Sequence, residues 1–137
     1  MSYAGDVTPA EAYDAVTGPD EALLVDVRSE AEWTFVGVPD LSSSGREPGF
    51  VEWSRWPGGA PNESFVDEVR ALGLTEGTPV YLLCRSGVRS SAAAEALTEA
   101  GLGPAYNIGD GFEGPHDPAH HRTPGGWKNS GLPWRQG

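Results

Sequence analysis

The sequence is poor in cysteine, in long apolar runs and in basic residues, and each shortage excludes something. Because Cys84 is the only cysteine among 137 residues, no disulfide can form within the chain and no cluster of cysteines can bind a metal. No apolar run approaches the roughly 18 residues that a membrane span needs, and residues 1–6 lack the basic and apolar regions of a signal peptide. We therefore expect a soluble, cytoplasmic protein without a membrane partner.

Basic residues are few and unevenly placed. The chain has 9 lysines and arginines against 20 acidic residues, a formal net charge of −11. This charge repels polyanions, so we do not expect nucleic acid as a partner. Residues 1–36 hold eight acids and a single base, Arg28, whereas residues 84–91 hold Arg85 and Arg89 and no acid. A short cationic segment is therefore present in an otherwise acidic protein.

Glycine and proline are abundant instead. The length suits one ordinary domain, and we expect residues 1–137 to form it. The 19 glycines and 12 prolines predict long irregular loops. One such loop is expected over residues 37–62, with a single short strand near Val51–Trp53. Residues 113–137 have the same composition but carry Trp127 and Trp134, so we expect a C-terminal tail of the same domain, held across its surface by aromatic side chains.

Helix and strand signals alternate along the rest of the chain. Thr8–Glu11 has the pattern of a capping box and predicts a helix over residues 9–17, and Ser29–Glu32 has the same pattern. Further signals predict strands over residues 23–27, 79–83 and 105–108, and helices over residues 65–72 and 90–100. This alternation predicts an α/β fold with a mainly parallel central sheet of about five strands and helices on both faces.

Cys84 is the candidate nucleophile because it stands between a predicted strand and a predicted helix. In an open α/β sheet, ligands bind beyond the carboxyl ends of the strands, where the next helix offers unpaired N–H groups and the positive end of its dipole. With Arg85 and Arg89 nearby in sequence, a thiol there should ionise more readily than a free thiol, and the thiolate is the nucleophile. Gly87 would let the loop curl into a nest of N–H groups for an anion. The alternative interpretation is a small cysteine buried in the core.

Over nearly its whole length, the chain resembles a known family, the single-domain rhodanese-like sulfurtransferases. The loop on the strand-to-helix junction is the specific part of the resemblance, whereas the Asp26–Arg28 motif alone is weak. The segments that carry it are Leu24–Arg28, Cys84–Ser91 with the helix that follows, Gly109–Phe112, Gly126–Trp127 and Gly131–Trp134. One departure is that many relatives read Gly-His-Ile-Pro-Gly-Ala after the second helix, where this chain reads Gly37–Asp40. The third strand and one wall of the pocket therefore differ from the family pattern.

The resemblance implies a two-step sulfur transfer that needs no metal and no organic cofactor. The Cys84 thiolate attacks the outer sulfur of thiosulfate or a similar anionic donor, sulfite leaves, and a persulfide forms. An external acceptor then removes that sulfur: cyanide in vitro, and a small thiol or a thiol protein in the cell. Arg85 and Arg89 would hold the donor, and two arginines favour compact thiosulfate over 3-mercaptopyruvate. The anion-binding loop so implied consists of Arg85, Ser86, Gly87, Val88, Arg89 and Ser90.

Asp26 and Arg28 are expected at the same crevice, because they end a neighbouring predicted strand. The resemblance implies that this pair braces the active-site loop and does not contact the substrate. The alternative interpretation is a surface ion pair, which contributes little to stability.

Other chemistries are weighed against this hypothesis. His116, His120 and His121 lie in a proline-rich segment with no helical frame and no nearby thiol, so we do not expect a metal site. A cysteine phosphatase or arsenate reductase is less favoured, because the phosphatase loop has one more residue between cysteine and arginine, which would place the arginine where this chain has Ser90. A non-catalytic persulfide relay or docking module with the same fold also stays open.

Overall fold

A computed structural model of the chain shows a five-stranded sheet in the order β1-β8-β7-β2-β4, with every neighbouring pair parallel. The strands of this sheet are β1 (Gly5–Val7), β8 (Gly103–Ile108), β7 (Glu76–Leu83), β2 (Leu23–Asp26) and β4 (Gly49–Phe50). The predicted α/β fold with a mainly parallel sheet of about five strands is confirmed. The structure describes residues 3–18, 22–28, 32–33, 37–41, 47–55, 60–73, 76–84, 88–109, 111–112, 127 and 132–135.

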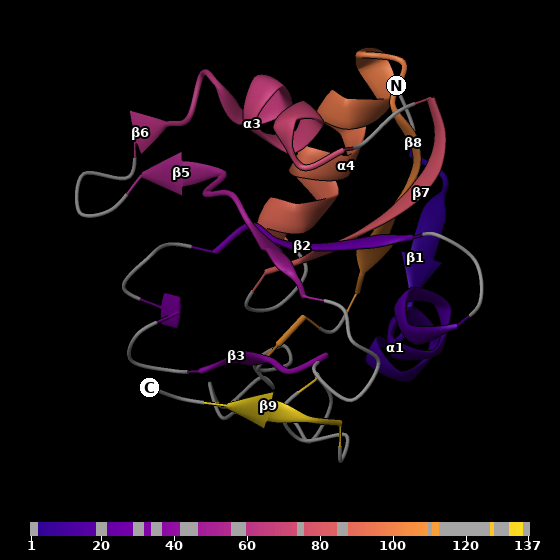
Figure 1. Ribbon diagram of the computed structural model, residues 1–137. Coiled ribbons are helices and arrows are strands. Elements are labelled where there is room, and N and C mark those ends of the chain that lie inside the picture. Colours follow the sequence, from indigo (N-terminus) through magenta and orange to yellow (C-terminus); the bar gives the residue numbers. More distant parts are fainter. Residues whose placement is uncertain are drawn as a thin grey trace, which may run out of the picture.

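Helices cover both faces of the sheet, as expected. Helices α3 (Phe65–Ala71) and α4 (Val88–Glu99) lie on one face, and α1 (Pro9–Thr17) lies on the other (Figure 1). The start of α1 has the predicted capping box: the Thr8 side chain accepts from the Glu11 backbone N–H at 3.1 Å, and the Glu11 carboxylate accepts from the Thr8 N–H at 2.9 Å. Two amides without helical partners are thereby satisfied. None of the helices in the described ranges combines the length and apolar character needed to cross a membrane.

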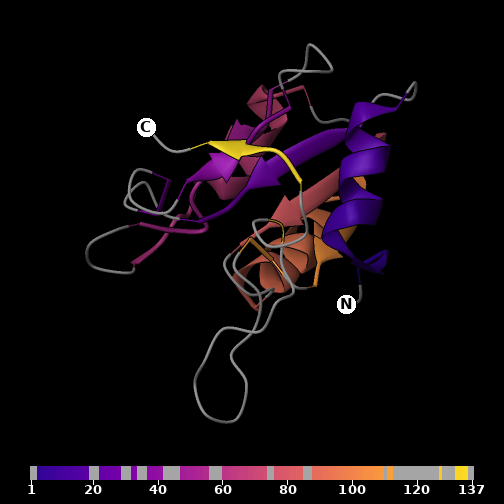
Figure 2. The same cartoon turned by 90° about the horizontal axis from the view of Figure 1, so that it is seen from below.

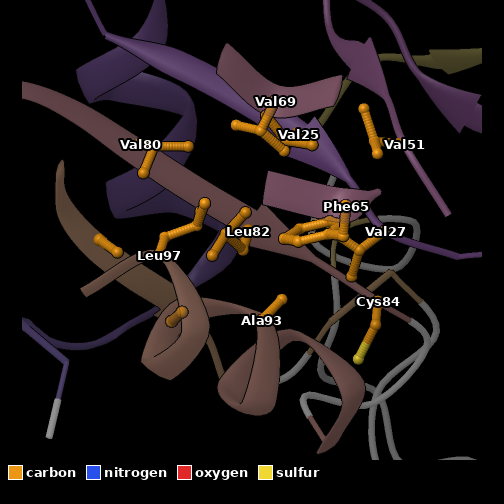
Figure 3. Close-up of a cluster of buried hydrophobic side chains, with 12 residues drawn as sticks. Val25, Val27, Val51, Phe65, Val69, Val80, Leu82, Cys84, Ala93 and Leu97 are labelled. Carbon is orange, nitrogen blue, oxygen red and sulfur yellow. The ribbon is translucent and has the colours of Figure 1, made fainter. Parts of the chain in front are cut away.

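The sheet separates two buried apolar clusters. The α3–α4 core includes Val25, Val27, Val51, Phe65, Val69, Val80, Leu82, Cys84, Ala93, Ala94, Leu97 and Ala105 (Figure 3). The α1 core includes Ala12, Val16, Leu24, Leu41, Leu83, Ile108, Phe112 and Trp127. Because successive side chains of a strand point to opposite faces, the residues of β7 alternate between the two cores. This alternation places Cys84, directly after β7, on the α3–α4 side of the sheet.

The strand predicted near Val51–Trp53 is wrong in position. The regular strand is β4, which ends at Phe50, and its two residues pair with Val25 and Asp26 of β2. The predicted residues still run beside β2, because the Val51 N–H donates to the Asp26 carbonyl at 3.1 Å and the Trp53 N–H to the Val27 carbonyl at 3.1 Å. The apolar side chains of Val51 and Trp53 therefore reflect this contact beside β2, although both residues lie outside a regular strand. The loop also contains three further short strands, β3 (Val38–Pro39), β5 (Ser54–Arg55) and β6 (Ala60–Pro61).

The C-terminal segment contributes a strand and a core residue on the α1 side. Strand β9 (Trp134–Arg135) pairs antiparallel with β3, and Figure 2 shows it on the same side of the sheet as α1. Trp127 is completely buried: its indole N–H donates to the Pro133 carbonyl at 2.8 Å, and its ring packs edge-on against Tyr13 at 5.6 Å. Trp127 therefore lies in the α1 core, whereas Trp134 is 38% exposed.

Candidate functional site

Cys84 occupies the predicted junction at the carboxyl end of the middle strand of the sheet. Strand β7 ends at Leu83, and α4 begins at Val88. The thiol is buried at the edge of the α3–α4 core, close to Phe65 and Val27 (Figure 3). Its backbone carbonyl accepts a hydrogen bond from the Phe112 N–H at 2.8 Å. The burial expected of a core cysteine is thus present, and polar side chains also lie near the thiol.

The first part of the predicted anion-binding loop lies outside the described residues. This applies to Arg85, Ser86 and Gly87, while Val88 is described only as the first residue of α4. The nest of N–H groups and the binding of the donor by Arg85 therefore stay predictions. Of the remaining loop residues, Arg89 and Ser90 lie in the first turn of α4 and have well-defined partners.

Ser90 lies directly beside the thiol. Its hydroxyl is buried and lies 3.3 Å from Cys84 Sγ, and it also forms a short hydrogen bond with Asn107 Oδ1. The Asn107 Nδ2 group in turn donates to Asp6 Oδ1 at 3.0 Å, and the Tyr3 hydroxyl donates to the same oxygen at 2.7 Å. This hydrogen bond to Asp6 is the main reason that the pKa of Tyr3 is raised.

Sequence reasoning missed both Asn107 and Asp6. A signal for Asn107 was present, because it has the same parity as Ala105 along a buried strand and so belongs on the face toward α4, where a polar side chain needs a partner. No local signal identifies Asp6. It reaches Asn107 because β1 and β8 are paired in parallel with these two residues in register.

Arg89 is held by a carboxylate from a distant part of the chain. Its two terminal nitrogens donate to the two carboxylate oxygens of Glu32, at 2.6 and 2.9 Å. This hydrogen bonding is the main reason that the pKa of Arg89 is raised, and the charges of Cys84 and Asp26 act in the same direction. Glu32 was predicted as part of a capping box with Ser29, which lies outside the described residues; its carboxylate binds Arg89 in the first turn of α4. Donor binding by Arg89 stays a prediction.

Asp26 and Arg28 form a buried ion pair, so the alternative of a surface ion pair is wrong. Both side chains are fully buried, and their closest charged atoms, Arg28 Nη2 and Asp26 Oδ2, are 2.6 Å apart. Arg28 Nε lies 2.9 Å from Asp26 Oδ1, and Nη2 also donates to the Gly37 carbonyl at 2.7 Å. The guanidinium lies 4.3 Å from the centre of the Phe112 ring. Since the Phe112 N–H binds the Cys84 carbonyl, the pair contacts the backbone of Cys84 through one intervening residue.

Metal ligands do not gather at this site. Among the described residues, no group of three or more histidine, cysteine, aspartate or glutamate side chains could hold a metal ion. His116, His120 and His121 lie outside the described ranges. The chemistry that the described site offers is therefore that of a thiol, a hydroxyl and two paired arginines.

This fold and this site define a rhodanese-like domain, in which a parallel sheet presents one cysteine at the start of a helix. The chain belongs to the rhodanese-like family: its residues 4–137 match the profile of the family described as the STR4 middle domain. It is 35% identical over 131 residues to uncharacterized protein RC0915 of Rickettsia conorii, covering 95% of this chain and 96% of that protein. It is 30% identical over 124 residues to the chloroplastic rhodanese-like domain-containing protein 4 of Arabidopsis thaliana, covering 90% of this chain and 24% of that longer protein.

Two solved structures have a similar fold. The crystal structure of Rv0390 from M. tuberculosis shares 55% sequence identity with the chain, has a TM-score of 0.88, and is matched over 99% of this chain and 100% of that one. The crystal structure of a rhodanese-like domain protein from Staphylococcus aureus shares 19% identity with a TM-score of 0.56, over 94% of this chain and 96% of that one. At this identity the second likeness concerns the fold alone.

Proposed function

We propose that this protein is a sulfurtransferase that moves a sulfane sulfur from thiosulfate, or a similar anionic donor, to an external acceptor through a persulfide on Cys84. The observation that carries the proposal is the position of Cys84, the only thiol of the chain, at the carboxyl end of β7 and beside the first turn of α4. Membership of the rhodanese-like family supports it.

In the first step, the Cys84 thiolate attacks the outer sulfur of thiosulfate. A new S–S bond forms between Sγ and that sulfur, the original S–S bond of thiosulfate breaks, and sulfite leaves with the bonding electron pair. The negative charge then lies on the terminal sulfur of the persulfide. The N-terminal end of α4 is suited to stabilise this charge, and the Ser90 hydroxyl lies 3.3 Å from Cys84 Sγ.

In the second step, a nucleophilic acceptor attacks the terminal sulfur of the persulfide. With cyanide as acceptor, a C–S bond forms, the persulfide S–S bond breaks, and Cys84 leaves as the thiolate while thiocyanate departs. Because the chain has no second cysteine, it cannot resolve the persulfide as an internal disulfide. The physiological acceptor in this proposal is therefore an external thiol, either a small molecule or a protein.

The two paired arginines serve mainly to position the nucleophile in this proposal. The Arg89–Glu32 pair fixes the first turn of α4, and the Arg28–Asp26 pair supports Phe112, whose N–H binds the Cys84 carbonyl. Such supporting contacts hold a reactive group in its productive orientation. The sequence predicts that Arg85 and Arg89 hold the donor anion. Because Arg89 is paired with Glu32, we assign this binding mainly to the backbone N–H groups of the loop and to Arg85.

The proposal predicts that replacing Cys84 by serine abolishes sulfur transfer without unfolding the protein. Thiocyanate formation from thiosulfate and cyanide is measured for the wild type and for Cys84→Ser, with circular dichroism and urea unfolding as checks of the fold. The variant is expected to show no activity above buffer, since a serine hydroxyl cannot form a persulfide. Thr98→Ser, on the far half of α4, is a matched control and should retain activity. Sulfur transfer by Cys84→Ser at the rate of the wild type would contradict the proposal. It would also be contradicted if the wild-type protein hydrolysed an aryl phosphate but transferred no sulfur.

A further inference from the structure

A continuous chain of hydrogen bonds runs from the Cys84 sulfur to a carboxylate at the surface. It passes from Cys84 to Ser90 on α4, then to Asn107 on β8 and to Asp6 on β1. Ser90 and Asn107 are buried, whereas Asp6 is exposed to solvent. A thiol below the surface is therefore connected to an exposed acidic side chain through two uncharged groups.

The direction of each hydrogen bond follows from the chemistry of its partners. A carboxylate can only accept, so Asp6 requires the NH₂ group of Asn107 to face it. The Asn107 carbonyl oxygen must then face Ser90, and a carbonyl oxygen can also only accept. The short contact between this oxygen and Ser90 Oγ is favourable only if the hydroxyl hydrogen lies between them. Asp6 thus fixes, through Asn107, where the Ser90 hydrogen points.

Ser90 has one hydrogen and two acceptors that compete for it. While Cys84 is a neutral thiol, Ser90 can donate to Asn107 and turn a lone pair toward the sulfur. Once the sulfur carries a negative charge, the hydrogen is drawn toward it, and the buried Asn107 carbonyl loses its donor. Leaving a buried acceptor unsatisfied is costly. The Asp6–Asn107 pair therefore competes with the Cys84 sulfur for the Ser90 hydrogen.

We propose that Asp6 and Asn107 are positioning residues that direct the Ser90 hydroxyl hydrogen away from the Cys84 sulfur. The inference rests on the proposed function only in that Cys84 is the nucleophile. The inference adds two residues, Asp6 and Asn107, that do not touch the Cys84 sulfur but influence whether Ser90 donates a hydrogen bond to it.

Other charged groups act near the two ends of this chain of hydrogen bonds. At the sulfur end, Arg89 of α4 interacts electrostatically with Cys84, and Glu32 and Asp26 interact with Arg89. At the surface end, Glu95 of α4 acts on the tyrosine that binds Asp6. All of these groups stay in place in the variants below, so differences between the variants report on the hydrogen-bond chain.

The most informative variant is Asp6→Asn, at an exposed position with nearly unchanged size. An asparagine can donate as well as accept, so the amide of Asn107 is free to turn over and offer its NH₂ group to Ser90. The Ser90 hydrogen then becomes available to the sulfur. We expect the pH at which half of Cys84 is ionised to fall by about half a unit to one unit, a roughly three- to tenfold gain in thiolate below that pH.

The Ser90→Ala background separates this effect from the loss of a negative charge. If Asp6 acts through Ser90, then Asp6→Asn should cause little or no further shift when Ser90 is alanine, whereas a simple charge effect would persist. Asn107→Leu is a second background with the same expectation, for use if Ser90→Ala does not fold. Asp14→Asn removes an exposed carboxylate of α1 outside the hydrogen-bond chain and should cause no shift.

Ionisation is measured from the pH dependence of alkylation by iodoacetamide, followed by intact mass, and from thiolate absorbance relative to Cys84→Ser. With one cysteine in the chain, both signals report on Cys84 alone. A fall in the midpoint for Asp6→Asn that disappears in the Ser90→Ala background supports the proposal. No shift for Asp6→Asn, or an equal shift in both backgrounds, overturns it. Neither readout uses a sulfur donor, so failure here is distinguishable from failure of the proposed function.

Discussion

At the scale of single residues, the buried pair of Asp26 and Arg28 carries the largest electrostatic cost in the described structure. Two charges removed from water lose several kcal/mol of solvation each, and only close, well-oriented contact compensates for this. Arg28 has such contacts with the Asp26 carboxylate, the Gly37 carbonyl and the Phe112 ring. The position of Gly37 favours glycine, because its φ of 114° is an angle that residues with a side chain rarely adopt. The pair therefore ties the end of β2 to the segment that supports Cys84.

Replacing Asp26 by asparagine should destabilise the protein strongly, because the Arg28 cation would stay buried without a counter-charge. We expect a loss of about 3–5 kcal/mol in the free energy of unfolding, measured by urea denaturation. The control is Asp67→Asn, which removes one partner of an exposed pair with Arg70 at 3.4 Å and should have little effect. Similar small losses for both variants would show that the buried pair does not hold this end of the sheet.

The residue scale also shows where sequence reasoning stops. The proximity of Cys84, Arg89 and Ser90 could be predicted because the three residues lie within one short segment of the sequence. Asp6 could not be identified, since it reaches Asn107 only through the parallel pairing of β1 with β8. The local spacing of Glu32 fits a cap with Ser29, which lies outside the described residues, but no local pattern predicts that its carboxylate binds Arg89, 57 positions away in sequence. Contacts across the fold thus decide the roles that local patterns leave open.

At the scale of elements, the regular helices and the buried strands were predictable and the edge strands were not. Helix α1 has its capping box and α4 is rich in alanine, so local propensity and burial agree. Strand β7 is an apolar run buried at the centre of the sheet. Edge strands β1 and β4 contain glycine, which is unfavourable in strands, and they form because a neighbouring strand offers its hydrogen bonds. Their positions therefore depend on the assembled sheet.

The C-terminal segment should stabilise the fold mainly through Trp127. Its ring fills part of the α1 core, its N–H binds the Pro133 carbonyl, and its backbone N–H donates to the Gly111 carbonyl at 2.8 Å. We expect Trp127→Ala to reduce the free energy of unfolding by about 3–5 kcal/mol, as is usual for a large buried aromatic side chain. Trp134→Ala, at a side chain that is 38% exposed, is the control and should cost clearly less in the same urea titration. Equal losses would contradict the assignment of Trp127 to the core.

At the scale of the whole molecule, the fold brings groups from both faces of the sheet to one cysteine. The α3–α4 side supplies Ser90 and Arg89, and the α1 side supplies Phe112, which rests on the Asp26–Arg28 pair. The net charge of −11 does not favour binding of an anionic donor. Arg28 and Arg89 are each already paired with a carboxylate. In the proposed function, donor binding therefore depends on Arg85 and on the local field at the start of α4, where backbone N–H groups and the helix dipole act at short range.

In the proposed function, Cys84 carries a sulfur atom between two half-reactions. The most direct test is intact-mass spectrometry of the wild type and of Cys84→Ser, before and after incubation with thiosulfate, and again after cyanide is added. We predict that the wild type gains the mass of one sulfur atom, that cyanide removes it with release of thiocyanate, and that Cys84→Ser gains nothing. The absence of any mass gain in the wild type, with thiosulfate and with other sulfur donors such as 3-mercaptopyruvate, would contradict the account.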